Sequence, residues 1–399
     1  MAVRPAGRSS DPLIVGVASL VGRPNDPTSP DAVGWMTEAA AAALAEVSGS
    51  AGGSAEVGWV GVAEGTWRCS DAGAVIAERL RLGGGKPVHT VRADVGILQQ
   101  RLIAEASAAI ARGQVGAALI IGGESRARDR AIVKAGGEAT QTPGPDGAEP
   151  DEVIHPAGEL MSEVELERDL ATPATQYAIV EDALAQADGI DRAALRRRLG
   201  ELWFGFAAVA ADNPTAWDRS APSGRTIVAT EGGNRMVADP YTRSLCSQWN
   251  VDAASALVLT SVEVADRLGV PPGQRIAVEA TVESNLILPL PQRAELQRWP
   301  AFEVVAGALA THCGVPVDGG LGADVLAGGG EQLLMRPRVV DVGEGGGVAE
   351  QGDDVVLVAA VRQENIAGLQ VAVDNAKLVC LAKREADLAS DVTGAHFRQ

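Results

Sequence analysis

Thiols and imidazoles are the groups in this 399-residue chain best suited to nucleophilic and acid–base chemistry, and each type occurs only four times. Cys69 precedes a helix expected to begin at Asp71, a place where a thiol can be activated, although a half-buried loop cysteine is the simpler interpretation. No cysteine belongs to a Cys-x-x-Cys pair or a dense framework, which indicates a reducing cytoplasm. The cysteines are Cys69, Cys246, Cys313 and Cys380.

Three histidines are candidates for a site. His89 falls in a short strand predicted over 87–91, near the start of a long predicted helix, so we expect it either to lie beside a bound ligand or to be structural. His312 and Cys313 are neighbours on a predicted helix, where adjacent side chains point about 100° apart, and they therefore form no dyad. His155 stands beside Pro156 in an acidic segment, and we expect it at the surface.

A pair of glycines, Gly122 and Gly123, follows a strand predicted over 115–121. Two interpretations are compatible with each other. The chain leaves the strand in a tight turn that only glycine allows, and the backbone closely approaches an acyl thioester. Ser125 lies in the same turn. No Gly-x-Gly-x-x-Gly pattern opens a helix after a strand, which excludes a dinucleotide-binding loop. The sequence predicts no metal site.

The formal net charge is −18, with 52 acidic against 34 basic residues, and such a field repels nucleic acid. No apolar run reaches the roughly 20 residues of a membrane-spanning helix, so no membrane association is expected. Two interpretations of a local basic cluster remain open: it binds the phosphates of coenzyme A, or it is a solvated helix face. The cluster comprises Arg126, Arg128, Arg130, Lys134 and residues 196–198.

The first 120 residues alternate between apolar strands and helical runs, which predicts an α/β fold with right-handed crossovers and a mostly parallel sheet. The alternation of strands and helices is interrupted by a charged segment over 124–175. It resumes after two predicted helices, over 176–187 and 192–211. The predicted strands are 13–17, 57–62, 87–91, 115–121, 254–260 and 275–282, and the other predicted helices are 31–47, 71–82, 94–112, 262–268 and 301–312.

Five segments, taken together and in this order, resemble the thiolase superfamily, in particular the acetyl-CoA acetyltransferase-like proteins, over roughly residues 10–317. The segments are 13–18, 117–125 with Gly-Gly-Glu-Ser at its end, 200–214, 234–242 with Asn-Arg-Met-Val-Ala-Asp-Pro-Tyr-Thr, and 251–261. The resemblance implies a layered αβαβα fold of two similar halves. It implies an N-terminal α/β domain over 1–123 and 250–270, an inserted cap over 124–249, and the start of a second half over 271–317.

The resemblance ends near Val317, and residues 318–399 remain unassigned. The second half is therefore expected to be truncated or replaced, for example through a shifted reading frame. A helix over 94–112 would then lose the partner for one apolar face, and the chain would need a second copy or a partner chain to cover it.

A thiolase needs a nucleophilic cysteine at the start of its central helix, and the resemblance places that position near Val95. Asp94 would cap the helix and would raise the pKa of a nearby thiol. No catalytic residue is therefore predicted, whereas Gly122, Gly123, Ser125 and His89 are expected to lie beside a coenzyme A thioester.

Two functions remain open from the sequence. The chain is either an acyltransferase-like protein of lipid metabolism that lacks its nucleophile, or a non-catalytic acyl-CoA-binding or scaffold subunit that pairs with an active partner. A non-functional gene remnant is the third interpretation. An acyl-CoA ligand and either a homo-oligomer or a partner protein chain are expected in the first two cases.

Overall fold

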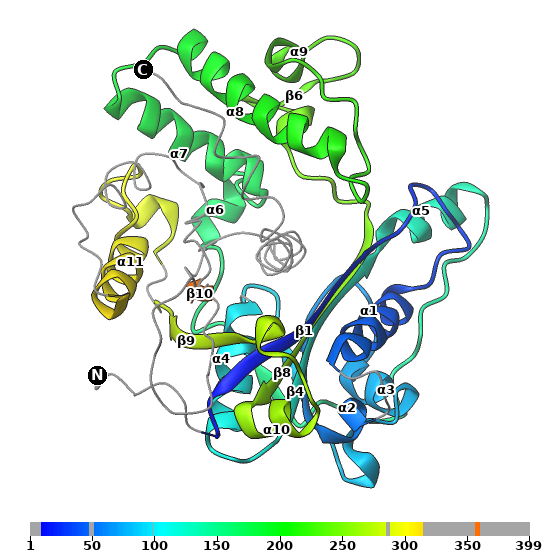
Figure 1. Ribbon diagram of the computed structural model, residues 1–399. Helices are drawn as coiled ribbons and strands as arrows, with labels where there is room; N and C mark the ends of the chain where they lie inside the picture. Colours follow the sequence, from blue (N-terminus) through cyan, green and yellow to red (C-terminus); the bar gives the residue numbers. More distant parts are fainter. Residues whose placement is uncertain (1–8, 48–51, 98, 285–287, 314–355, 360–399) are drawn as a thin grey trace.

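The computed structural model describes residues 9–47, 52–97, 99–284, 288–313 and 356–359. Its strands form one eight-stranded sheet in the order β10-β9-β1-β8-β4-β2-β3-β5, and a small hairpin, β6-β7, lies apart (Figure 1). Strands β2, β3, β4 and β5 are parallel, as are β9 and β10, while β8 runs antiparallel to both β1 and β4. The sheet strands are β1 (Pro12–Val21), β2 (Val57–Ala63), β3 (His89–Ala93), β4 (Ala117–Ser125), β5 (Glu152–Ile154), β8 (Asp252–Ser261), β9 (Ile276–Val282) and β10 (Val356–Ala359).

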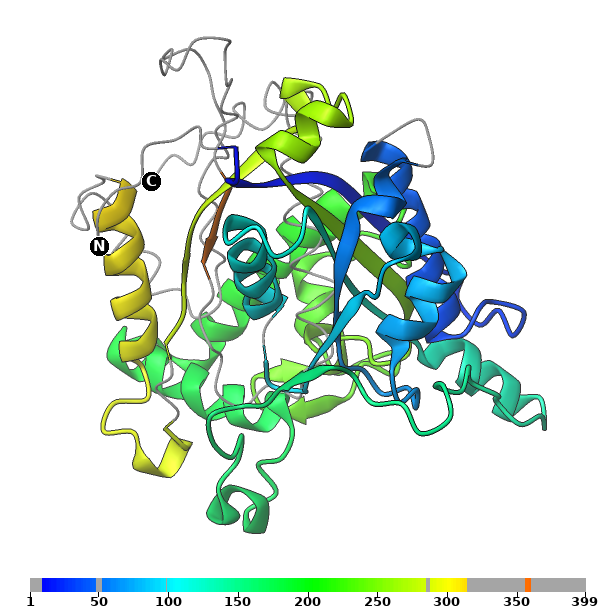
Figure 2. The ribbon, with the colours of Figure 1, turned by 90° about the horizontal axis from the view of Figure 1, so that it is seen from below.

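Helices cover both faces of the sheet (Figure 2). One face packs against α1 (Ala32–Val47) and α3 (Ala72–Arg79), with the short α2 (Gly52–Glu56) beside them, and the other packs against α4 (Gln99–Ala111). Side chains alternate between the two cores because successive strand residues point to opposite faces. In β2, for example, Val60 joins the α1 core and Trp59 the α4 core.

Strand β1 bends at a bulge between Ile14 and Gly16. A β-carbon on Gly16 would lie 2.4 Å from the carbonyl oxygen of Ala43 in α1, so only glycine lets the helix approach the strand this closely. The bulge also shifts the alternation, since Val15 faces the α1 core and Val17 faces the α4 core.

Helices α6, α7, α8 and α9, all between β4 and β8 in the chain, form most of a second layer above the sheet in Figure 1. Helices α7 and α8 pack there with α9 around a separate small core of Ala185, Leu195, Leu199, Ile227 and Leu245. Gly200 and Gly224 allow the backbones of α8 and α9 to touch, because a β-carbon on either would lie within 2.7 Å of the other's carbonyl oxygen. The elements are α5 (Arg126–Lys134), α6 (Glu163–Glu167), α7 (Pro173–Ala187), α8 (Arg192–Asp212), α9 (Gly224–Val228), β6 (Met236–Ala238) and β7 (Tyr241–Thr242).

The remaining described helices flank the sheet. Helix α10 (Val262–Arg267) follows β8, and α11 (Pro300–Cys313) lies beside β9 (Figure 1). Four short 3₁₀ helices occur at turns: η1 (Leu82–Gly85), η2 (Arg243–Leu245), η3 (Pro272–Gln274) and η4 (Leu290–Gln292). No helix within the described ranges is both long and apolar enough to cross a membrane.

The predicted α/β class and the mostly parallel sheet are confirmed, but two local predictions are wrong and one strand was missed. Helix α4 begins at Gln99 rather than at Asp94. Strand β4 continues through Gly122 and Gly123 to Ser125, so these glycines make no turn. Strand β5 was not predicted at all. The reading-frame hypothesis falls mainly on residues 314–355 and 360–399, which lie outside the described residues.

The expectation of an uncovered face on α4 is also wrong for the side chains that the structure describes. Leu102, Ile103, Ala106 and Ile110 are all buried, at 4% exposure or less. They pack in one core with residues of β1, β2, β3, β4 and β8. These four described side chains therefore require no second chain to cover them.

Candidate functional site

The carboxyl ends of the parallel strands β2, β3, β4 and β5 meet at one edge of the sheet, called here the carboxyl edge. In open α/β sheets this edge is where ligands bind. Acidic side chains leave three of these strands: Glu64 follows β2, Asp94 follows β3, and Glu124 lies near the end of β4. The start of β8 reaches the same edge, since Asp252 pairs with Ser125.

The turn over residues 94–97 joins β3 to the segment that leads into α4. The N–H of Val95 donates to Glu64 Oε2 at 3.1 Å, and the N–H of Ile97 donates to the carbonyl of Asp94 at 2.9 Å. Gly96 has φ +96°, a left-handed backbone conformation that favours glycine. The side chain of Leu160 packs over Gly96, with Cδ2 2.5 Å from where a β-carbon would lie. The turn therefore presents a valine beside the carboxylates of Asp94 and Glu64, and none of its four residues carries a thiol.

An Arg–Asp–His arrangement lies beside this turn. Nδ1 of His155 is 2.5 Å from Asp94 Oδ2, and the guanidinium Nε of Arg92 is 3.2 Å from Asp94 Oδ1. The backbone N–H of Asp94 donates to Ile154 at 3.0 Å, which fixes β5 against the end of β3. The side chain of His155 is 68% exposed, so it lies at the surface as expected, but it is held by a carboxylate rather than free.

The contact between His155 and Asp94 was not predictable from the sequence, because it depends on β5 joining the sheet. Its only local signal is the pair Val153-Ile154, a short apolar step inside an acidic segment. Three residues are too few to show a strand period.

A buried carboxylate occupies the neighbouring part of the edge. Glu124 is 5% exposed and accepts hydrogen bonds from the N–H and the hydroxyl of Thr66, at 2.5 and 2.8 Å. Burial raises the pKa of Glu124, while the bonds from Thr66 act in the opposite direction. Gly65 leaves room for the carboxylate, since a β-carbon there would lie 2.4 Å from Glu124 Oε1.

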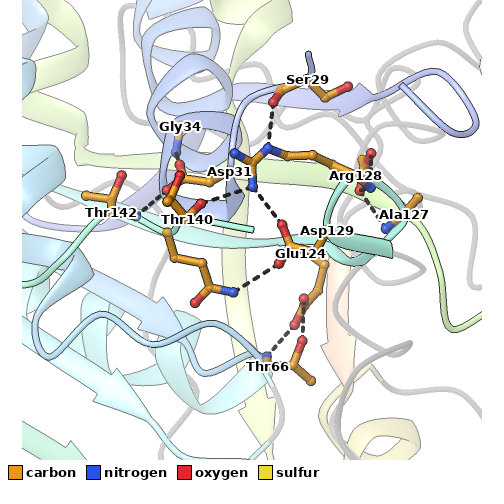
Figure 3. A network of polar contacts seen from close by, with 12 residues as sticks. Ser29, Asp31, Gly34, Thr66, Glu124, Ala127, Arg128, Asp129, Thr140 and Thr142 are labelled. Carbon is orange, nitrogen blue, oxygen red and sulfur yellow. Dashed lines mark hydrogen bonds and ion pairs between the residues drawn. The ribbon is translucent and has the colours of Figure 1, made fainter. Parts of the chain in front are cut away.

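Figure 3 shows a second polar network beside Glu124, built around α5. Arg128 donates to Ser29 O at 2.9 Å and to Thr140 O at 3.1 Å, and pairs with Asp129 at 2.6 Å. Asp31, the residue at which this helix was predicted to begin, caps α1 by accepting the N–H of Gly34 at 2.8 Å. These contacts tie α5 and the 140–142 segment to the start of α1.

Asp252 anchors the other side of α5. This fully buried carboxylate accepts the N–H groups of Ala127 and Arg128 at 2.9 and 3.0 Å. Burial raises the pKa of Asp252, and the two backbone bonds favour its charged form. It is a structural group that holds the first turn of α5 to the central strand.

The predicted site residues are divided between the two edges of the sheet. Gly122, Gly123 and Ser125 lie at the carboxyl end of β4. Gly123 is required by packing, because a β-carbon would lie within 3 Å of Met36 and Ala254, and Ser125 is 2% exposed.

His89 begins β3 and aligns with Trp59 near the start of β2, so it stands at the opposite edge. The expectation that it lies close to the start of the central helix is therefore corrected. Its imidazole is 3.5 Å from Asp151 and 3.7 Å from Glu152. The structure does not bring it together with Gly122.

Two cysteines are described with their side chains, and neither lies in the 94–97 turn. Cys69 is buried, and burial raises the pKa of its thiol, with the neighbouring carboxylates of Asp71 and Asp31 acting in the same direction. Cys246 follows η2, where its thiol donates to the carbonyl of Thr242 at 3.4 Å, and burial raises its pKa. Both thiols are thus shifted away from the reactive thiolate form.

Most of the basic cluster is occupied by partners. Arg196 pairs with Asp239 at 2.6 Å and Arg198 with Asp188 at 3.0 Å, and Arg128 belongs to the α5 network. The guanidinium of Arg126 stacks on Trp249 at 5.2 Å. Arg130 and Lys134, one and two turns further along α5, are exposed. Within the described ranges, no group of three His, Cys, Asp or Glu side chains could hold a metal ion.

Comparisons with known proteins match this chain by structure. No model of a protein family matches its sequence, and no curated protein matches it either. The crystal structure of a monomeric SCP2-thiolase like protein type 1 from Mycobacterium smegmatis has 25% identity and a TM-score of 0.60. It covers 78% of this chain, and the chain spans 59% of that protein's length.

Two further structures are similar. An Ltp2–ChsH2(DUF35) aldolase has 18% identity and a TM-score of 0.54, covering 77% of this chain and 70% of its own. The dimeric peroxisomal thiolase of Saccharomyces cerevisiae has 14% identity and a TM-score of 0.42, covering 66% and 68%. The first two likenesses show that the chain has a thiolase-like α/β fold over the matched segment.

Proposed function

We propose that this chain of thiolase-like fold binds an acyl-CoA thioester at its carboxyl edge and does not transfer acyl groups through a cysteine. The observation that carries the proposal is the 94–97 turn, in which Val95 stands at the position implied for the nucleophile and its N–H is bound by Glu64. A valine side chain has no atom that can attack a thioester.

The surroundings of the turn support the second half of this proposal. Asp94 and Glu64 place two carboxylates around Val95, and a carboxylate nearby disfavours a thiolate. A thiol could act from elsewhere only if it reached this turn, and Cys69 is buried on the α1 side of the sheet, in the other core.

The binding half of the proposal rests on the fold and on the glycines at the end of β4. Gly122 is only partly buried, so part of its surface can be contacted by a ligand at the carboxyl edge, although it pairs with Ser255 in the sheet. The exposed Arg130 and Lys134 could bind the phosphates of coenzyme A at the surface of α5.

Calorimetric titration with acetyl-CoA and with a longer acyl-CoA tests binding, and thiolysis of acetoacetyl-CoA tests acyl transfer. We expect saturable binding and no thiolysis above the rate without protein. Robust thiolysis would refute the assignment of Val95, and the absence of binding for both ligands would refute the proposal as a whole.

A specific observation favours a scaffold subunit as the second candidate. Leu195, Leu199, Leu202, Phe206 and Val209 form one stripe along α8 at spacings of four and three residues. The first two are buried in the small core, whereas the last three are 38%, 56% and 71% exposed. An exposed continuation of a core stripe is typical of a helix that binds another protein.

One of the compared structures, the Ltp2–ChsH2(DUF35) aldolase, is described as an assembly of two named chains, which is compatible with a partner for this protein. Light scattering on the purified chain and on a Phe206→Ser, Val209→Ser variant tests this candidate. A wild-type oligomer that the variant abolishes would support an interface at α8, and a monomer in both cases, with acyl-CoA binding intact, would favour the first candidate.

A further inference from the structure

The imidazole of His155 is arranged as a base is in hydrolytic enzymes. Asp94 holds Nδ1 at 2.5 Å, and the guanidinium of Arg92 lies 3.2 Å from the other oxygen of the same carboxylate. A carboxylate at Nδ1 selects the tautomer in which Nδ1 carries the proton and Nε2 keeps its lone pair. Because the side chain is 68% exposed, Nε2 is accessible to water and to a ligand.

The neighbouring turn supplies a free backbone donor. The N–H groups of Asp94, Val95 and Ile97 are all hydrogen-bonded, to Ile154, Glu64 and Asp94 respectively. Among the described residues, the N–H of Gly96 has no such partner. Gly96 follows by two residues the carboxylate that holds His155, and an unpaired N–H in such a turn is what an oxyanion site requires; Leu160 lies over the same glycine as an apolar contact.

We propose that His155 is the general base for hydrolysis of an acyl-CoA thioester at this turn, an inference that rests on the proposed acyl-CoA binding. Nε2 takes a proton from water as the water oxygen bonds to the thioester carbonyl carbon, and Gly96 N–H stabilises the oxyanion. The C–S bond then breaks, its electron pair stays on sulfur, and the imidazolium returns the proton to give the free acid and coenzyme A thiol. Asp94 is the residue that positions the base.

Hydrolysis is measured as release of coenzyme A thiol from acetyl-CoA and from a longer acyl-CoA, with Ellman's reagent. His155→Ala should lower the turnover number by about 100-fold or more, and Asp94→Asn by about tenfold or more, because a positioned base contributes about 10²–10⁴-fold. Added imidazole should restore part of the activity of His155→Ala, since the removed ring is exposed, and none of the activity of Asp94→Asn.

His89→Ala is the matched control, because His89 is also a partly exposed histidine near carboxylates but stands at the opposite edge. Its turnover number should remain within about twofold of the wild type. Circular dichroism melts confirm that each variant is folded.

Two results would overturn the inference. One is hydrolysis by the wild type no faster than in buffer while calorimetry shows acyl-CoA binding, which leaves the proposed function intact. The other is a folded His155→Ala variant that is as active as the wild type. Absence of both binding and hydrolysis would instead refute the proposed function itself.

Discussion

A cysteine placed in the 94–97 turn by Val95→Cys should carry a thiol that is less acidic than a free one. The carboxylate of Glu64 accepts the N–H of this residue at 3.1 Å, so it would stand roughly 6 Å from the new sulfur. Two unit charges at that separation interact with about 2.8 kcal/mol at an effective dielectric constant of 20.

Solvent screening and the guanidinium of Arg92 both reduce this value, because a third of the Glu64 side chain is exposed and Arg92 Nε lies 3.9 Å from Glu64 Oε1. About 1.4 kcal/mol then remains, which raises the pKa of the introduced thiol by about one above its ordinary value of about 8.5. The positive end of α4 offsets little of this, since the helix begins four residues later at Gln99 and its effect falls off within one turn.

The assay is alkylation by iodoacetamide as a function of pH, followed by mass spectrometry on the peptide that carries position 95. At pH 7.5 the introduced thiol should react about tenfold more slowly than a free cysteine, and Glu64→Gln in the same background should restore most of the rate. An apparent pKa at or below about 8.5 with Glu64 intact, or no response to Glu64→Gln, would refute the electrostatic reasoning.

Three further predictions concern stability, measured as the free energy of unfolding in denaturant. Burial raises the pKa of Glu124, so the stability that this residue contributes is present below the ordinary pKa of a glutamate and is lost as pH rises through the raised value. The free energy of unfolding of Glu124→Gln should therefore increase relative to that of the wild type between pH 4 and pH 8, and a constant difference would contradict this. Gly16→Ala should lower the free energy of unfolding by about 1–3 kcal/mol, because the added methyl pushes α1 away from β1. Gly205→Ala on α8 should raise it by about 0.5–1 kcal/mol, because no atom lies within 4 Å of the added β-carbon. Equal effects would show that the packing at Gly16 is looser. Leu102→Ala, which empties a fully buried site on α4, should cost about 2–5 kcal/mol, and a loss below 1 kcal/mol would mean that α4 is not held by the sheet.

The repeating units of the fold were predictable because their signals are local. Asp31 and Asp71, where two helices were predicted to begin, cap those helices by accepting the N–H groups of Gly34 and Ala74. The apolar runs before and after these helices became β1, β2, β3 and β4. Antiparallel β8 could not be oriented from its own residues, because a fully buried strand has the same apolar run in either direction.

The candidate site was less predictable because it is made by tertiary contacts. Asp94 resembled a helix cap, yet its backbone pairs with β5 and its carboxylate holds His155. Gly122 and Gly123 suggested a turn, but the strand continues through them, paired with β8, and Gly123 packs closely against Met36. In both cases a distant segment, absent from any local window, decided the outcome.

The position of β8 at the centre of the sheet has a consequence for how the protein folds. Its hydrogen-bonded neighbour β4 ends at Ser125 and β8 begins at Asp252, so residues 126–251 form one closed loop between adjacent strands. Closing a flexible loop of this length costs about 4 kcal/mol of chain entropy, and contacts so distant in sequence slow folding. During synthesis the edges of β1 and β4 that later pair with β8 therefore remain unpaired until β8 has been made. We expect the nascent chain to need a chaperone most during this interval.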